Sequence, residues 1–162
     1  MSGMNRSAGG ARAAAASARL LALVASCFGI SAQAGLGEGA DSIARDHGAL
    51  QAQADSKTTT ASYDRHEITM ASGTRVREYV SRAGKVFAVS WSGPTLPDLK
   101  TVLAGHYADF VSAASAPRHN HHVLTISTPD LVLQNSRLPR GFAGHAHIPS
   151  LVPAGTSAGA LD

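Results

Sequence analysis

The stretch that decides the fold runs from Ala71 to Leu99 and reads ASGTRVREYVSRAGKVFAVSWSGPTLPDL. Residues 74–80 alternate in character, and a period of two indicates a β-strand. Residues 85–91 are rich in β-branched and aromatic residues, which is the strongest strand signal in the chain. The loop between them ends in Gly84, a residue suited to a positive φ. We therefore predict a β-hairpin here.

Alternation also predicts which side chains share a face of this hairpin. One face of the first strand is expected to carry Val76, Glu78 and Val80, and the other Arg75, Arg77 and Tyr79. In the second strand Phe87 and Trp91 have the same parity, so we expect both on one face, with Ser90 and Ser92 on the wet face. Two interpretations stay open for these aromatic side chains. A core face beneath a helix is favoured over an aromatic binding surface, because strands commonly bury aromatic residues.

An amphipathic helix is predicted downstream of the hairpin. Its apolar residues are spaced by three or four positions, which traces one helix face. They are Leu99, Val102, Leu103, Tyr107, Phe110, Val111 and Ala114. We expect the N-cap at Thr95 or Leu96, Pro97 in the first turn and the end at Pro117. Gly105 either weakens this helix or marks close packing.

Further strand patterns flank this unit. Residues 66–70 predict a short strand before the hairpin. Residues 123–127 and 131–134 predict a second hairpin around a turn at 128–130, and residues 140–148 predict a glycine-bearing edge strand. The expected fold class is α+β: a small antiparallel sheet built from two hairpins, with one amphipathic helix packed on one face.

Composition divides the chain into four segments. Residues 1–34 form a leader, and residues 35–62 hold few large apolar side chains, which is typical of a flexible N-terminal arm. Residues 63–148 are expected to form the α+β core domain. Residues 149–162 are a Pro/Gly-rich C-terminal tail.

The leader has the basic, apolar and small-residue order of a secretory signal peptide. Its only charged residues are arginines, and residues 20–30 form an uncharged apolar run. Ala32 and Ala34 occupy the small-residue positions of a signal peptidase site. We predict cleavage between Ala34 and Gly35, and a protein that is periplasmic or secreted.

Two other interpretations of residues 1–34 compete with a cleaved leader. A transmembrane anchor is disfavoured because residues 20–30 are fewer than the roughly 20 apolar residues that a span needs. A lipid anchor at Cys27 is suggested by the lipobox-like residues 24–27, although the apolar run continues beyond the cysteine. Translation from Met4 instead of Met1 also stays open.

Removing the leader changes the charge and the thiol content. The chain has 14 Lys and Arg against 11 Asp and Glu, and three of the arginines lie in the leader, so 11 bases and 11 acids remain. A nucleic-acid-binding protein needs a basic stripe, so we expect no nucleic-acid partner. Cys27 is the only cysteine, so the predicted mature chain lacks disulfides and thiol chemistry.

The stretch at 71–99 resembles the exported bacterial proteins grouped as domain of unknown function 2844. Residues 141–144, Gly-Phe-Ala-Gly, and residues 151–155, Leu-Val-Pro-Ala-Gly, are similar to the C-terminal part of that family. The resemblance implies a signal peptide, a variable arm and a hairpin-plus-helix core. It implies no activity and no catalytic residue, and the histidines near residue 120 are not part of the family pattern.

Histidines form two groups with a possible metal-binding role. The first is His119, His121 and His122 in a turn, and the second is His145 and His147, whose spacing puts both imidazoles on one face of a strand. Imidazole nitrogens bind Zn²⁺, Cu²⁺ and Ni²⁺. Because the chain has no H-E-x-x-H motif, exposed polar residues are the favoured interpretation and no cofactor is expected.

Catalytic motifs are missing from the sequence. There is no G-x-S-x-G or S-x-x-K motif, and residues 35–39 are no phosphate loop. Asp98 and Asp109 are too far apart on the predicted helix to flank one bond. We expect a non-enzymatic binding or accessory module of the cell envelope, with an unknown envelope protein or ligand as partner. A histidine-based metal-binding protein is the first alternative, and a minor envelope hydrolase is the second.

Overall fold

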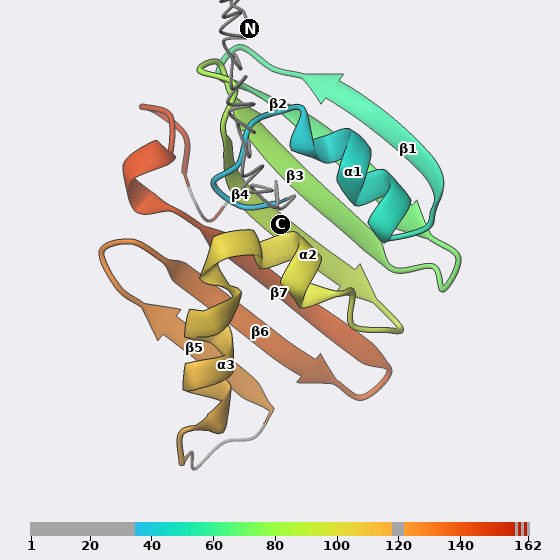
Figure 1. Cartoon of the computed structure of the whole chain (residues 1–162), viewed down its shortest axis with the longest axis vertical. Helices are drawn as coiled ribbons and strands as arrows, with labels where there is room; N and C mark the ends of the chain where they lie inside the picture. The colour runs from blue at the N-terminus through green and yellow to red at the C-terminus, as the bar shows by residue number, and fades with distance from the viewer. Residues whose placement is uncertain (1–34, 118–121, 158, 160, 162) are drawn as a thin grey trace, which may run out of the picture. The chain divides into compact units, whose positions relative to one another are not determined.

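The computed structural model describes residues 35–117, 122–157, 159 and 161. Among these residues seven strands form one antiparallel sheet in the order β1-β2-β3-β4-β7-β6-β5 (Figure 1). The strands are β1 Ala52–Thr59, β2 Tyr63–Met70, β3 Arg75–Ser81, β4 Val86–Gly93, β5 Val123–Ser127, β6 Val132–Leu138 and β7 Gly141–His147. The helices are α1 Ser42–Ala49, α2 Leu99–Leu103 and α3 Tyr107–Ser115, with 3₁₀ turns η1 Ala104–His106 and η2 Pro149–Leu151. The α+β class is confirmed, and the sheet is larger than the two predicted hairpins.

The three α-helices lie in front of the same face of the sheet (Figure 1). The main hydrophobic core fills the space between them and includes Ile43 of α1, Val102 of α2 and Val76 of β3. We call this side of the sheet the covered face. The opposite side, which carries Arg77 of β3 and Ser90 of β4, is called the open face. Tyr79 and its neighbours form a second, smaller core there.

The central hairpin of β3 and β4 is confirmed, but the facing of its aromatic residues differs from the prediction. The register steps from Tyr79↔Ala88 to Val80↔Val86, so Phe87 is an extra residue in a β-bulge. The bulge turns Phe87 toward Tyr79 on the open face, while Trp91 stays in the main core. Phe87 and Trp91 are 0% and 2% exposed. They are therefore core residues of opposite faces rather than one binding surface.

The expectation of a flexible arm over residues 35–62 is wrong. This segment forms α1 and the edge strand β1, and Leu36, Ile43 and Leu50 are buried in the main core. Backbone hydrogen bonds from Leu36 N to Val102 O at 3.1 Å and from Gly37 N to Val86 O at 2.8 Å join the segment to α2 and β4. Tertiary packing stabilises short helices more than their own propensity does. Burial of three large apolar residues is therefore enough to hold this segment against the domain.

The predicted single helix is broken in two. Its N-cap is Asp98 instead of Thr95 or Leu96, and the Asp98 carboxylate accepts a hydrogen bond from Lys100 N at 3.0 Å. Ala104 has a φ of 48°, which interrupts the helix between α2 and α3. Asp98 and Asp109 consequently belong to different helices.

Strand β7 is central, whereas the sequence predicted an edge strand. It pairs with β4 on one side and β6 on the other. A Cβ atom at Gly144 would overlap the Trp91 indole, so the glycine leaves room for that ring to cross the strand. Trp91 Nε1 donates a hydrogen bond to Asn135 Oδ1 of β6 at 3.1 Å. Beyond β7, the C-terminal tail packs Leu161 against Tyr79 and closes one end of the open face.

Candidate functional site

A cleft on the open face is the main candidate site. Pairing of four strands sets Arg77, Ser90, His145 and Gln134 side by side in one row across the sheet. The next row along the strands holds Arg75, Ser92, Ala143 and Ser136. Because side chains alternate along each strand, both rows point to the same face. Together they line a cleft of about 440 Å³, whose lining also includes Trp91 and Gly144.

The charge of this cleft is positive. None of the described residues that line it is acidic. Arg77 Nε donates to Glu67 Oε2 of β2 at 2.6 Å, and this contact lowers the pKa of Glu67, with smaller contributions from the charges of Arg75 and Arg65. Glu67 therefore faces more than one arginine, and the exposed Arg75 adds positive charge at the rim. Arginine, serine, glutamine and histidine side chains can recognise an anionic or polar group here.

An apolar hollow continues the cleft along the same strands. It has a volume of about 520 Å³ and shares Ser92 with the cleft. Its other lining residues are Gly93, Pro94, Leu138, Pro139, Arg140, Gly141 and Phe142. A Cβ at Gly141 would collide with the Gly93 carbonyl, so the two backbones touch at its base. Cleft and hollow together are called the groove below.

The structure separates the candidate metal-ligating histidines. His145 lines the cleft, and His147 lies two residues along on the same face of β7. Burial lowers the pKa of His147, and the neighbouring His145 lowers it further. His122 instead lines a hollow against Phe110 of α3, on the covered face. His119 and His121 lie outside the described residues.

Among the residues that are described, no group of three or more His, Cys, Asp or Glu side chains is placed to hold a metal ion. The predicted cleavage site at Ala34 and the cysteine Cys27 fall within residues 1–34, for which no structure is described.

A buried pair of acids, Asp46 of α1 and Glu78 of β3, was not singled out from the sequence. Both residues are 0% exposed. Burial is the main cause that raises the pKa of both carboxyls, and the pKa of Glu78 rises to about 10. With both groups ionised, no described donor satisfies their oxygens, whereas a protonated Glu78 can donate to Asp46. The sequence does contain a sign that Glu78 is buried, because Glu78 lies between Val76 and Val80 on one face of the predicted strand.

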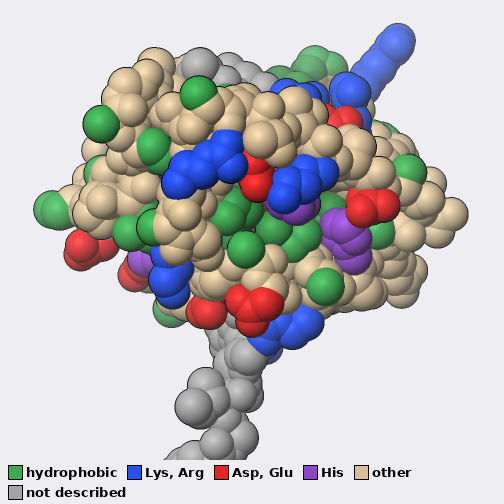
Figure 2. Space-filling view, turned by 90° about the horizontal axis from the view of Figure 1, so that it is seen from above, with side chains coloured by type: hydrophobic (Ala, Val, Ile, Leu, Met, Phe, Trp, Pro, Cys, Tyr) green, Lys and Arg blue, Asp and Glu red, His purple; other side chains and the backbone are tan. Residues whose placement is uncertain are grey.

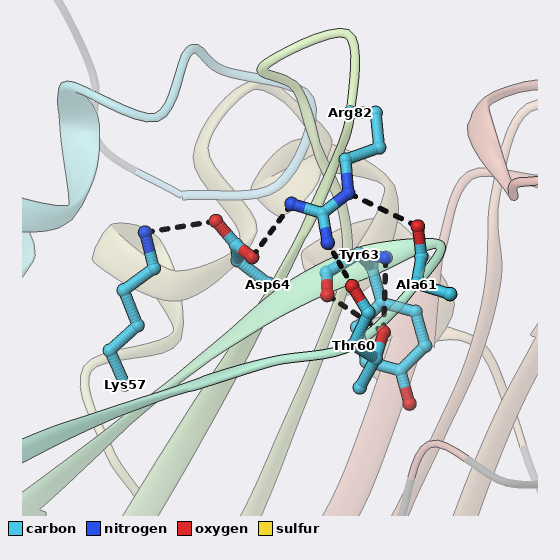
Figure 3. A network of polar contacts seen from close by, with 6 residues as sticks. All are labelled: Lys57, Thr60, Ala61, Tyr63, Asp64 and Arg82. Carbon is cyan, nitrogen blue, oxygen red and sulfur yellow. Dashed lines mark hydrogen bonds and ion pairs between the residues drawn. The ribbon is translucent and has the colours of Figure 1, made fainter.

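An ion network at the end of the sheet has a structural role (Figure 3). Asp64 of β2 accepts from Lys57 Nζ at 2.9 Å and from Arg82 Nη1 at 3.0 Å, and these contacts lower its pKa. Arg82 also donates to the carbonyl oxygens of Thr60 and Ala61. The network joins the β1–β2 turn to the β3–β4 turn.

In the view from above, basic, acidic and histidine side chains lie around a hydrophobic area (Figure 2).

These features define a class: an α+β protein with one antiparallel sheet, its helices on one face and a basic cleft on the other. Within this class, the chain belongs to the family described as protein of unknown function (DUF2844), whose model matches residues 32–161. The resemblance of the central hairpin is thereby confirmed. No curated protein and no solved structure matches the chain. In the part of the chain that the structure describes, no helix has the length and apolar character to cross a membrane.

Proposed function

We propose that this protein is an exported, non-enzymatic binding module of the cell envelope that takes an anionic ligand in the open-face cleft. The observation that carries the proposal is the pair of cross-strand rows. They gather arginine, serine, glutamine and histidine side chains from β3, β4, β6 and β7 around the cleft. Rigid strands hold such groups in fixed positions, which favours recognition of one ligand shape.

Titration with a short anion tests this binding function. Sodium butyrate added to the purified protein is expected to shift the NMR signals of the Gln134 side-chain amide and the His145 ring. Arg75→Gln should reduce these shifts, because it removes the exposed charge at the rim. Arg65→Gln is the matched control, since Arg65 lies on the open face outside the cleft. Shifts that depend equally on both arginines would contradict a specific site.

Export is a separate part of the proposal and rests on the basic, apolar and small-residue order of residues 1–34. Intact-mass analysis of fractionated cells is expected to find a chain that begins at Gly35 in the periplasm or the medium. A lipid mass on Cys27, or a retained leader, would overturn this part.

Metal binding is the second candidate, because His145 and His147 share one face of β7. If it holds, Zn²⁺, Cu²⁺ or Ni²⁺ at micromolar concentration binds the wild-type protein and the His122→Ala control, but not a variant that carries both His145→Ala and His147→Ala. Equal binding by all three proteins would exclude these two residues as the ligands. The hydrolase alternative has no comparable observation in its favour.

A further inference from the structure

The groove has two chemically different parts in a fixed order. On β4 the open-face residues are Ser90 and Ser92, and Pro94 follows just beyond the end of the strand. On β6 they are Gln134, Ser136 and then Leu138. The arginines of β3 lie beside the polar end. Polar lining therefore gives way to apolar lining in one direction, toward the β6–β7 turn.

The spacing of the two parts suits a single extended ligand. Two residues along a strand span about 7 Å and four span about 13 Å. An anionic group held beside Arg75 would place the atoms attached to it over Ser92, and the next part of the ligand over Leu138. Ser92 lines both the cleft and the hollow, so the two parts adjoin at this residue.

The hollow exposes apolar side chains to water. Leu138 is 49% exposed at its edge. Covering this surface is favourable, because it removes apolar atoms from water. Gly93 and Gly141 approach closely, so backbone forms part of the lining of the hollow.

A peptide is the less suitable occupant. The strands at the base of the groove pair on both sides, β4 with β3 and β7, and β6 with β5 and β7. Their backbone groups are engaged within the sheet and cannot add a further strand there. The N–H and C=O groups of a peptide lying in the hollow would face a mostly apolar lining, in which the Arg140 side chain is the one charged group among the described residues. An alkyl chain has no such polar groups.

We propose that the groove binds a monomeric single-chain amphiphile, a carboxylate carried on a linear alkyl chain, with the carboxylate at Arg75 and Arg77 and the chain over Ser92 and Leu138. This inference rests on the proposed binding function and specifies its ligand class. Arg75 and Arg77 lie at the polar end of the groove, although Arg77 also pairs with Glu67. Arg140 lines the other end, where the rest of the described lining is uncharged, so the apolar lining together with the charge of Arg75 orients the ligand.

Calorimetric titration of the purified protein with sodium decanoate, kept below its micelle concentration, tests the inference. Decanoate is expected to bind at least tenfold more tightly than butyrate, which has the same carboxylate and a short chain. It should also bind at least tenfold more tightly than decanol, which has the chain without the charge. Equal affinities for decanoate and butyrate would overturn the amphiphile and leave the anion-binding function intact. Absence of binding by both carboxylates would overturn both proposals.

Two variants locate the chain and the carboxylate. Leu138→Asp is expected to weaken decanoate at least tenfold and butyrate by much less, because the short chain of butyrate does not reach Leu138, whereas Arg75→Gln should weaken both carboxylates to a similar extent. Val111→Asp on α3 is the matched control, because Val111 is exposed to a similar extent, 42%, and does not line the groove. Far-UV circular dichroism confirms that each variant is folded. Loss of decanoate binding in Val111→Asp to the same degree as in Leu138→Asp would overturn the assignment.

Two further probes distinguish other occupants. A hexapeptide that ends in a leucine carboxylate is expected to bind more weakly than decanoate, and tighter binding by the peptide would overturn the amphiphile. Phosphatidylglycerol vesicles should not retain the protein on flotation. Retention by vesicles without binding of monomeric decanoate would assign the groove to a membrane surface instead.

Discussion

At the scale of single residues, the buried acids Asp46 and Glu78 have the clearest consequence. Folding moves Glu78 from water, where its pKa is about 4.5, to a site where its pKa is about 10. The native protein therefore holds a proton that the unfolded chain releases above pH 4.5. By linkage, Glu78 does not reduce the free energy of unfolding below pH 4.5, where both states bind the proton. The free energy of unfolding then decreases as the pH rises toward 10, because only the unfolded chain loses the proton. Arg45 and His47 lower the pKa of Asp46 and Glu38 raises it, but burial outweighs them.

Replacement of Glu78 by glutamine tests this reasoning. Glu78→Gln keeps a hydrogen-bond donor for Asp46 without a group that must stay protonated. One pKa unit corresponds to about 1.4 kcal/mol, so we expect the variant to be more stable than wild type by about 1–4 kcal/mol at pH 8. Little difference is expected at pH 4. Urea unfolding at both pH values measures this.

The control for this experiment is Glu67→Gln on the open face. The pKa of Glu67 is lowered by Arg77, so its contribution to stability is present above its unfolded pKa and is lost as the pH falls. Glu67→Gln should therefore lower the free energy of unfolding at pH 8, whereas Glu78→Gln should raise it. A wild-type stability that stays constant from pH 5 to pH 8 would be evidence against the protonated pair.

At the scale of elements, the position of β7 depends on Gly144. The strand lies between β4 and β6, where the Trp91 ring passes over it toward Asn135. Any side chain at position 144 would overlap that ring and the Gln134 carbonyl. Glycine is thus required at position 144 in a central strand, although a glycine-bearing strand was predicted at the edge. Close approach of another residue, here Trp91, is a second reason for glycine in a strand.

Gly144→Ala is expected to destabilise the protein by about 1–3 kcal/mol, the usual cost of overpacking a core. Gly48→Ala in α1 is the control, because no atom lies within 4 Å of the Cβ it would add. Alanine has the higher helix propensity, so this control should be neutral or stabilising by up to about 1 kcal/mol. Thermal unfolding of the two variants provides the comparison, and equal midpoints would contradict the proposed packing.

At the scale of the whole molecule, the N-terminal segment completes the core. Leu36 and Leu50 are each 2% exposed and belong to the main hydrophobic core. A cluster of side chains from α1, α2 and the sheet fills this space, so residues 35–62 are part of the domain rather than an appendage.

Leu50→Ala is therefore expected to cost about 2–5 kcal/mol of unfolding free energy, as large-to-small core substitutions do. Leu96→Ala should cost much less, since Leu96 is 37% exposed. Urea denaturation distinguishes the two. If Leu50→Ala were as mild as Leu96→Ala, the flexible-arm interpretation would return.

Features that depend on local periodicity could be predicted from the amino-acid sequence. The period of two in residues 74–80 and 85–91 predicted the β3–β4 hairpin, and alternation placed Arg75 and Arg77 on the face opposite Val76. The family resemblance also rested on this stretch. Local patterns suffice here because hairpin partners are close in the chain and the turn sets their register.

Features that depend on the pairing of distant segments could not be predicted from the sequence and were found in the folded structure. The bulge at Phe87, the central position of β7 and the burial of Leu36 each involve contacts that no local pattern encodes. The candidate site has the same origin. Arg77, Ser90, His145 and Gln134 come from four strands, and only their register aligns them into one row. Side-chain direction is a local property of a strand, whereas the neighbours of that strand depend on the packing of the whole sheet.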